Sequence, residues 1–372
     1  MIYADNAATT KLDIDALDAM LPWLQEKYGN ASQPYSFARG PKKALGEARA
    51  MIAMCIGANP EEIFFTSGGT ESDNWAIKGM LQYSDQRVII TSQIEHHAIL
   101  HACEATERLG YPVIYLPVNS KGIVTPDTLT KSITRNTKLV SVMLVNNEIG
   151  SIQPITELAN IAHDHSALFH TDAVQAIGHI PVNVKALGVD MLSASAHKFN
   201  GPKGIGFLYI RKGTPIQPFV DGGSQEFGMR AGTENVASIV GMATALKKNC
   251  DHLAETGQKL RTLEQTFIET LQKANVDFIR NGSDDRVPGN VSISIRDASG
   301  EMLLHRLDLK GISISTGSAC DSVSTKISHV IQAIGVPKEY AEGTIRVSFG
   351  RDNQIEDAVQ IASCIIDILQ RR

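Results

Sequence analysis

Lys198 follows an apolar stretch that begins near Met191, and it leads into a turn at Gly201-Pro202. A lysine at the end of a buried strand is unfavourable unless its charge is compensated or its amine is used. Lysine amines form covalent C=N links with carbonyl compounds. Lys198 is therefore a candidate for covalent chemistry on a carbonyl group.

Asp172 also follows an apolar stretch, Ala167–His170. A buried aspartate must be paired or strongly hydrogen-bonded, and a positively charged pyridinium nitrogen would satisfy it. The alternative is that Asp172 only caps the next short helix.

A Gly-rich turn follows the apolar stretch Ile63–Phe65 and contains Gly68, Gly69 and Thr70. Free N–H groups at the start of the next helix, near Glu71, would form a cradle for an anion. The plain alternative is an ordinary capped turn, and neither nucleotide-binding fingerprint fits the turn. A lysine, an aspartate and a phosphate cup are the groups that pyridoxal phosphate typically needs, and their coincidence is more specific than any one of them.

Two further predicted strand ends carry polar groups. His96 follows the stretch Val88–Thr91, where an imidazole can stack on a flat ring and move protons near neutral pH. His97 and His101 have an i, i+4 spacing that could bind a metal, but solvated helix positions are the simpler interpretation. Asn147 follows the apolar stretch 139–145, and its amide could bind a ligand or serve only the turn.

These residues need a sheet whose strands end at one edge, because ligands of open α/β sheets bind beyond the carboxyl ends of the strands. Short apolar runs predict strands at 63–65, 88–90, 113–116, 139–145 and 167–169, with amphipathic helices near 44–55 and 155–162 between them. This alternation predicts a mainly parallel α/β sheet with helices on both faces.

After about residue 233 the pattern changes to that of a smaller α+β domain. Helices are expected at 234–250, 252–274, 301–309, 325–334 and 354–370, and strands at 290–295, 312–315 and 344–349. We expect a large domain at 15–255 and a small domain formed by 1–14 and 256–372.

The composition excludes several classes of protein. The 372 residues carry a formal net charge of -5, which provides no electrostatic footprint for nucleic acid or an anionic membrane. The N-terminus does not resemble a secretory signal, and no apolar run is long enough for a transmembrane helix, so a cytoplasmic location is expected. The five cysteines are scattered along the chain and include no C-x-x-C pair: Cys55, Cys103, Cys250, Cys320 and Cys364. A disulfide framework or a zinc ribbon is therefore not expected.

The chain resembles the cysteine desulfurases of the NifS/IscS type, in the class V aminotransferase family, over nearly its whole length. The motifs that carry the resemblance are 5–10, 66–74, 95–96, 146–150, 172–175, 195–198 with 201–204, 230–233, 315–320 and 345–348. It implies a type I pyridoxal phosphate fold, with a mainly parallel seven-stranded sheet in the large domain and a smaller α+β domain that carries the catalytic cysteine.

The resemblance also implies roles for individual residues. Lys198 would bind pyridoxal 5'-phosphate covalently, His96 would stack on its ring and assist proton transfer, and Asp172 would pair with the ring nitrogen. Asn147 and Gln175 would hydrogen-bond the ring, and Arg346 would hold the substrate carboxylate together with Asn147. The remaining expected cofactor contacts are with the phosphate: Gly69, Thr70, Ser195, His197 and, from the partner subunit of a homodimer, Thr233.

Cys320 lies in a small, polar stretch, 315–322, that suits a reactive thiol in an exposed loop. By contrast, Cys55 and Cys364 lie on apolar helix stripes, and nothing near Cys103 or Cys250 suggests reactivity. The expected reaction converts L-cysteine to L-alanine, leaves a persulfide on Cys320 and passes the sulfur to an acceptor protein for iron–sulfur cluster assembly or for thiolation of tRNA or a cofactor. Asp321 departs from the family pattern and would disfavour the thiolate by charge repulsion.

Several alternatives stay open. A selenocysteine lyase, a cysteine-sulfinate lyase and a true aminotransferase share this fold, and a sulfur-relay module would mainly bind partners. A zinc protein using His97 and His101, or His163, His165 and His170, is a weaker interpretation. The chain ends at Arg372, whereas housekeeping members of the family carry a longer tail that engages the iron–sulfur scaffold, which weakens the expectation of that partner.

Overall fold

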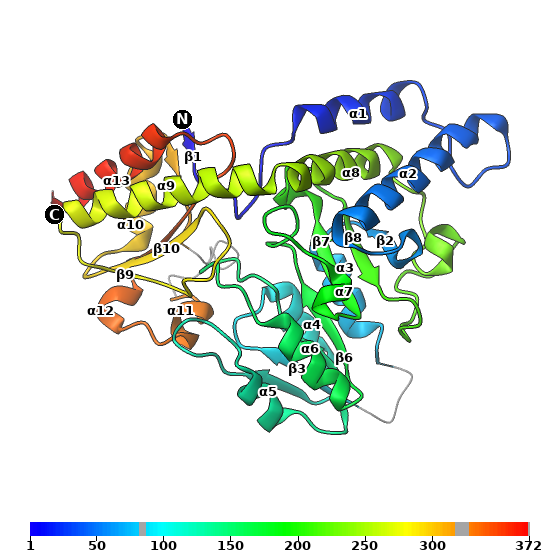
Figure 1. Ribbon diagram of the computed structural model, residues 1–372, viewed down its shortest axis with the longest axis horizontal. Helices are drawn as coiled ribbons and strands as arrows, with labels where there is room; N and C mark the ends of the chain where they lie inside the picture. Colours follow the sequence, from blue (N-terminus) through cyan, green and yellow to red (C-terminus); the bar gives the residue numbers. More distant parts are fainter. Residues whose placement is uncertain (82–86, 317–326, 371–372) are drawn as a thin grey trace.

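A seven-stranded sheet lies at the centre of the larger part of the molecule (Figure 1). The computed structural model describes residues 1–81, 87–316 and 327–370. The strands of this sheet are β2 (Ile63–Thr66), β3 (Val88–Ser92), β4 (Val113–Leu116), β5 (Thr137–Ser141), β6 (Leu168–Asp172), β7 (Met191–Ser195) and β8 (Gly206–Ile210). Their order is β2-β8-β7-β6-β5-β3-β4, and only β8 runs antiparallel to its neighbours. The prediction of a mainly parallel α/β sheet is confirmed.

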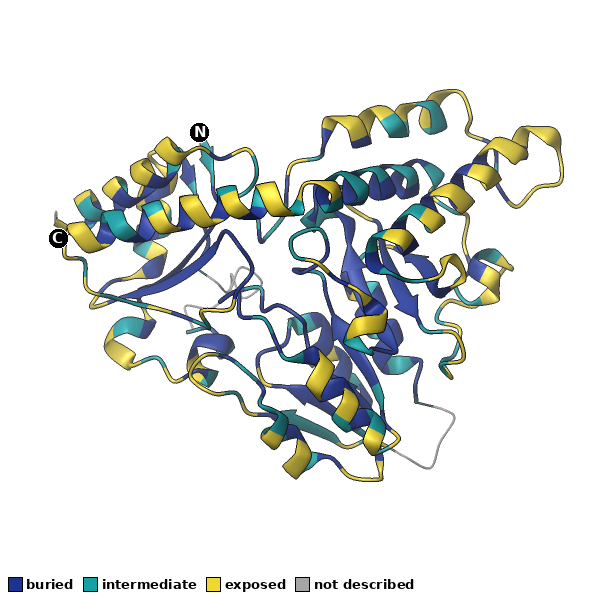
Figure 2. Ribbon diagram, viewed as in Figure 1, coloured by how far each residue is buried: buried dark blue, intermediate teal, exposed yellow. Residues whose placement is uncertain are grey.

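Helices cover both faces of this sheet. They are α2 (Arg39–Ile56), α3 (Gly69–Lys78), α4 (His97–Glu107), α5 (Pro126–Ser132), α6 (Ile155–Asp164), α7 (Val184–Leu187) and α8 (Val236–Asp251). Helix α1 (Ile14–Gln25) packs on the outside of α8 (Figure 1). Successive residues of β2 point to opposite faces: Ile63 and Phe65 join the core under α2, α6 and α8, whereas Phe64 joins the core under α3 and α4. The strands are buried on both faces, as Figure 2 shows.

A second core is formed by the C-terminal part of the chain. Its elements are α9 (Leu253–Lys273), β9 (Phe278–Arg280), β10 (Asn290–Ile295), α10 (Gly300–Asp308), β11 (Ile312–Ser313), α11 (His329–Ala333), α12 (Lys338–Ala341), β12 (Thr344–Ser348) and α13 (Ile355–Gln370). The antiparallel sheet β12-β10-β9 packs against α9, α10 and α13. Helices α8 and α9 meet at His252 and run end to end across the molecule (Figure 1).

The N-terminus joins this second core. Strand β1 (Ile2–Tyr3) pairs in parallel with β11, and Ala4 is fully buried among the residues of the second core. The main chain then passes to the large sheet, where the Thr10 N–H donates to the carbonyl oxygen of His197. The division of the chain into 15–255 against 1–14 and 256–372 stays a prediction.

Some element boundaries differ from those expected. The strand expected at 139–145 covers Thr137–Ser141. Its pairing with β3 ends at Ser141, and the Met143 N–H donates to both carboxylate oxygens of Glu95 at 3.1 Å, whereas the Leu144 N–H still donates to the carbonyl oxygen of Asp172 in β6. The antiparallel strand β8 was not expected from the sequence pattern. The helix expected at 325–334 covers His329–Ala333, and residues 325 and 326 lie outside the described residues.

Among the described residues, no helix is both long enough and apolar enough to cross a membrane.

Candidate active site

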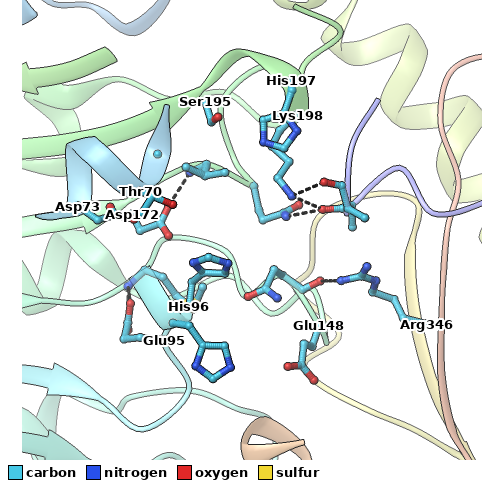
Figure 3. A pocket seen from close by; sticks show the side chains of 18 of the residues that line it. Thr70, Asp73, Glu95, His96, Glu148, Asp172, Ser195, His197, Lys198 and Arg346 are labelled. Atoms are coloured by element: carbon cyan, nitrogen blue, oxygen red, sulfur yellow. Dashed lines mark hydrogen bonds between the residues drawn. The ribbon is translucent and has the colours of Figure 1, made fainter. Parts of the chain in front are cut away.

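A cavity of about 280 Å³ opens at the carboxyl ends of β6 and β7 (Figure 3). The predicted site residues that line it are Gly69, Thr70, His96, Asn147, Asp172, Gln175, Ser195, His197, Lys198 and Arg346. They come from separate stretches of the chain, and the fold brings them together at the carboxyl ends of the strands, where ligands of open α/β sheets bind.

The turn between β2 and α3 forms one wall. Helix α3 begins at Gly69, and its first turn therefore presents free N–H groups toward the cavity. A Cβ atom on Gly69 would lie 2.7 Å from Val174 Cγ2, so only glycine permits this close approach. Ser195 at the end of β7 lies on the other side of the same turn, and the wall is suited to an anion.

The Lys198 side chain projects into the cavity from the short helix Ala196–Lys198. Its ammonium donates to the carbonyl oxygens of Ala7 at 2.6 Å and Ala8 at 2.8 Å. Neither of these two partners is a carboxylate, so these bonds hold the amine in place without neutralising it. The arrangement leaves the amine facing the cavity (Figure 3).

Asp172 is 5 % exposed at the end of β6. Its Oδ1 accepts the Val174 N–H at 2.8 Å. Burial raises the pKa of Asp172 to about 6, although the Val174 hydrogen bond and the charge of Lys198 oppose this rise. A cation placed in the cavity would stabilise the ionised carboxylate further.

Two buried acids beside Asp172 line the cavity but were not predicted as site residues. Asp73 on α3 is 1 % exposed, and burial, followed by the nearby Asp172, raises its pKa well above the ordinary value. Glu95 is fully buried, and burial raises its pKa to about 8 in spite of hydrogen bonds from Ser92 and Met143. Because the pKa of Glu95 lies above that of Asp172, Asp172 ionises more readily than Glu95 near neutral pH.

The pKa of Glu95 predicts how stability depends on pH. In the unfolded chain the carboxyl titrates near 4.5 and in the folded chain near 8, so its contribution is fully present below about pH 4.5 and is lost as the pH rises toward 8. Glu95→Gln imitates the protonated acid. Its free energy of unfolding, relative to that of the unaltered chain, should rise by a few kcal/mol between about pH 5 and 8.

Urea unfolding of both proteins at several pH values measures this difference. Glu61→Gln is the matched control, because Glu61 is exposed. A difference for Glu95→Gln that does not change with pH would show that Glu95 is ionised in the folded chain.

His96 lies over the cavity as the residue that caps α4. Its Nδ1 accepts the Ala98 N–H at 3.1 Å, which places the proton of a neutral ring on Nε2. Burial, followed by the charge of Lys198, lowers the pKa of His96 to about 4, so the ring is neutral at pH 7. His97 also lines the cavity, which corrects the expectation of a solvated position for it, whereas His101 does not line it.

Arg346 reaches the cavity from β12 in the second core, where it is 2 % exposed. Its Nη1 donates to the carbonyl oxygen of Asn147 at 2.8 Å, and its Nη2 donates to Asp5 Oδ1 at 2.8 Å. Its Nε is buried and has no hydrogen-bond partner among the described residues. The guanidinium is therefore oriented by the protein and has donor capacity left.

The segment 317–326 is flanked by anchors at this cavity. On its N-terminal side, Ser315 and Arg346 exchange main-chain hydrogen bonds of 3.0 and 2.7 Å. On its C-terminal side, Ser328 Oγ donates to Glu148 Oε2 at 2.6 Å, and Glu148 lines the cavity. Ser315 and Ser328, which lie on either side of these positions in the sequence, are thus held beside the cavity.

One predicted residue of the described chain does not line the cavity: Thr233, which is exposed. Cys320 lies outside the described residues. The histidines of the zinc alternative have separate partners: His163 binds Asp190 at 2.8 Å, and His170 bonds Ser141 and Ser193 at 2.9 Å. Over residues 1–81, 87–316 and 327–370, no group of three or more metal-ligating side chains could hold a metal ion.

The sequence matches the family model described as "Aminotransferase class-V" over residues 2–361. It is 49% identical over 373 residues to "Cysteine desulfurase IscS" of Dictyoglomus turgidum, a match that covers 100% of this chain and 94% of that protein. It is 46% identical to "Cysteine desulfurase IscS" of Methanosarcina thermophila, with 100% and 92% covered.

Solved structures share the fold. A "NIFS-LIKE PROTEIN" superposes with a TM-score of 0.94 at 37% identity, and each chain is covered to 100%. A structure named "SspA in complex with cysteine" superposes with a TM-score of 0.84 at 34% identity and covers 94% of this chain and 99% of the other.

Proposed function

Because the chain belongs to the class V aminotransferase family and is a cysteine desulfurase, we propose that it takes sulfur from L-cysteine with pyridoxal 5'-phosphate bound at Lys198, and that a persulfide forms on Cys320. The observation that carries the cofactor assignment is the meeting of Lys198, Asp172 and the N-terminus of α3 in one cavity. An amine, a buried carboxylate and an anion cradle are the three groups that this cofactor requires.

The cavity residues fit the phosphate of the cofactor. The first turn of α3 and the hydroxyl groups of Thr70 and Ser195 offer donors, and the absence of a Cβ on Gly69 lets a ligand approach the main chain. His197, whose Nδ1 bonds Thr9 Oγ1 at 3.1 Å, would complete this wall.

The opposite end of the cavity fits the ring. The buried Asp172 carboxylate would face the ring nitrogen, and a cation there would lower the pKa of Asp172 from its raised value. The neutral imidazole of His96 would stack on the ring. Gln175, whose Nε2 donates to the Ala7 carbonyl oxygen at 2.9 Å, and Asn147 would hydrogen-bond the edge of the ring.

Arg346 would hold the substrate carboxylate. Its two Nη atoms donate to Asn147 and Asp5. Its buried Nε–H has no hydrogen-bond acceptor among the described residues and could donate to a ligand. The fixed guanidinium would orient the amino acid so that its Cα lies near the Lys198 amine.

The chemistry divides between the cofactor and the protein. When bound, the cofactor supplies a sink for the electron pair of a bond broken at Cα. Lys198 Nζ would take the Cα proton and later return a proton to the product, and His96 would assist these transfers. The Cys320 thiolate would attack the substrate sulfur as the carbon–sulfur bond breaks. The net reaction is then L-cysteine plus the Cys320 thiol giving L-alanine plus the Cys320 persulfide, in which atoms and electrons balance.

The proposed product pattern has a direct test. The cofactor-loaded protein is incubated with L-cysteine and a thiol reductant, which releases the sulfur as sulfide, and alanine and sulfide are quantified. Equal amounts of the two, formed without a keto acid, are expected. A strict requirement for a keto acid would indicate an aminotransferase instead.

The proposal includes a sulfur-acceptor protein, either a scaffold for iron–sulfur cluster assembly or an enzyme that thiolates tRNA or a cofactor. A persulfide that must pass to another protein suits a reducing compartment such as the cytoplasm. The cysteines among the described residues are all free thiols, which is consistent with this location.

The proposal also includes a homodimer. One face of α1 exposes aliphatic side chains at i, i+3, i+7 and i+10, with exposed fractions from 37% to 61%, and α1 is largely exposed in Figure 2. These residues are Ile14, Leu17, Leu21 and Leu24. A second copy of the chain would cover such a face. In that dimer Thr233, which does not line the cavity of its own chain, would reach the phosphate end of its partner's cavity.

Leu21→Lys tests the dimer. A lysine in this face should weaken association by at least about 100-fold, because each copy loses apolar burial and gains a charge at the contact. Sedimentation velocity at decreasing concentration measures the change, and Val359→Lys is the matched control because Val359 is equally exposed, at 41% against 40%. A variant that sediments as the unaltered chain does at every concentration would place the interface elsewhere.

A further inference from the structure

Two cysteines outside the candidate active site lie at neighbouring helix ends. Cys55 is in the last turn of α2 and Cys250 is in the last turn of α8, and these two helices pack against each other (Figure 1). Both side chains are half-buried and contact the same hydrophobic core. Neither residue lines the cavity that holds Lys198.

The two thiols interact with each other, and this interaction affects the pKa of both. This arrangement corrects the expectation that nothing near Cys250 suggests reactivity. When Cys250 ionises, the Cys55 thiol can donate a hydrogen bond to the thiolate. This interaction lowers the pKa of Cys250 and raises the pKa of Cys55. Cys103, by contrast, is fully buried, and burial raises its pKa to about 12.

The charged neighbours of the pair come from α8. Lys247 lies close enough to favour a thiolate on Cys250, whereas Asp251 opposes it. These two residues also pair with each other, with 2.6 Å between Lys247 Nζ and Asp251 Oδ1. Neither cysteine is fully buried, and Met54 next to Cys55 is 62% exposed, so this helix end lies at the surface.

We propose that Cys55 and Cys250 form a redox-active dithiol that closes to an intramolecular disulfide with a low-molecular-weight disulfide as oxidant. Their placement in the last turns of two helices that pack on each other, with both side chains against one hydrophobic core, carries this assignment. A disulfide has an S–S length of about 2.05 Å, shorter than the contact between hydrogen-bonded thiols, so the two helix ends approach each other as the bond forms.

The reaction proceeds by two exchanges. The Cys250 thiolate attacks one sulfur of the oxidant, RSSR, forming a mixed disulfide and releasing RS⁻. The Cys55 thiolate then attacks Cys250 Sγ and releases the second RS⁻. The two protein thiols are oxidised, RSSR is reduced to two RSH, and the two protons lost by the cysteines are taken up by the two leaving thiolates.

The test uses the folded, cofactor-loaded chain without denaturant. The reduced protein is incubated with glutathione disulfide, quenched with acid, alkylated and digested without reductant. Mass spectrometry should find a linked peptide pair containing Cys55 and Cys250, two hydrogens lighter than the sum of the reduced peptides. Dithiothreitol should restore both thiols.

Two variants serve as controls. In Cys55→Ser the second exchange cannot occur, so Cys250 should retain a mixed disulfide with glutathione, whereas Cys364→Ser should form the linked pair as the unaltered chain does. The proposal is overturned if the unaltered chain yields only mixed disulfides at these positions, or if both thiols remain open to alkylation. These outcomes do not depend on desulfurase activity, so they test the dithiol separately from the proposed function.

Discussion

Replacing Lys198 with alanine should reduce alanine formation from L-cysteine by about 10³-fold or more. The substitution removes both the amine proposed to bind the cofactor and the group proposed to move the Cα proton. The substitution removes two hydrogen bonds, those from the Lys198 amine to the carbonyl oxygens of Ala7 and Ala8, and we expect the fold of the cavity to survive their loss. The activity loss should therefore not reflect unfolding.

Borohydride trapping separates this prediction from a general loss of function. In the unaltered chain, borohydride should fix the chromophore to the protein, so that it remains after denaturation and gel filtration. Lys198→Ala should bind the cofactor only reversibly, whereas Lys203→Ala should behave as the unaltered chain does, because Lys203 is an exposed residue in the same turn. A chromophore that is still fixed in Lys198→Ala would exclude Lys198 as the attachment point.

The second large effect is expected for Cys320→Ala. Without the thiol that receives the sulfur, sulfide and alanine formation should both fall by about 10³-fold, while borohydride trapping at Lys198 stays unchanged. This combination separates loss of the sulfur acceptor from loss of the cofactor. Intact-mass measurement after brief exposure to L-cysteine should find one added sulfur atom on the unaltered chain and none on the variant.

Cys364→Ala is the matched control, because Cys364 is half-buried against the second core, away from the cavity. It should retain the added sulfur and full activity. Undiminished sulfide formation by Cys320→Ala would exclude the role proposed for Cys320.

The residues at strand ends were predictable because polar groups follow short apolar runs. Lys198, Asp172 and Gly69 stand out in this way, and ligands of open α/β sheets bind at the carboxyl edge, so the sequence alone places these three residues in one site. Arg346 has no such local signal. It reaches the cavity only because β12 belongs to a second core that packs beside the sheet, so it could be placed there only through the family resemblance.

The buried acids could not be predicted from their surroundings in the sequence. Asp73 belongs to the motif 66–74 of the family resemblance, but its burial depends on how α3 packs over β7 and β8. Glu95 belongs to a motif of the family resemblance, yet only the fold shows that its carboxylate accepts the Met143 N–H just beyond the end of β5. The carbonyl oxygens of Ala7 and Ala8, which hold the Lys198 amine, carry no side-chain signal at all.

The pairing of the N-terminus with the C-terminal core constrains the order in which the chain can mature on the ribosome. Residues 1–8 are synthesised first, but β1 pairs with β11 and the Asp5 carboxylate accepts from Arg346, 341 positions later in the chain. The larger sheet can fold while synthesis continues, whereas the lysine amine acquires its carbonyl partners only after β12 has left the exit tunnel. Contacts of such long range fold slowly. The complete cavity, to which Arg346 of β12 contributes, can therefore form only when synthesis is nearly complete.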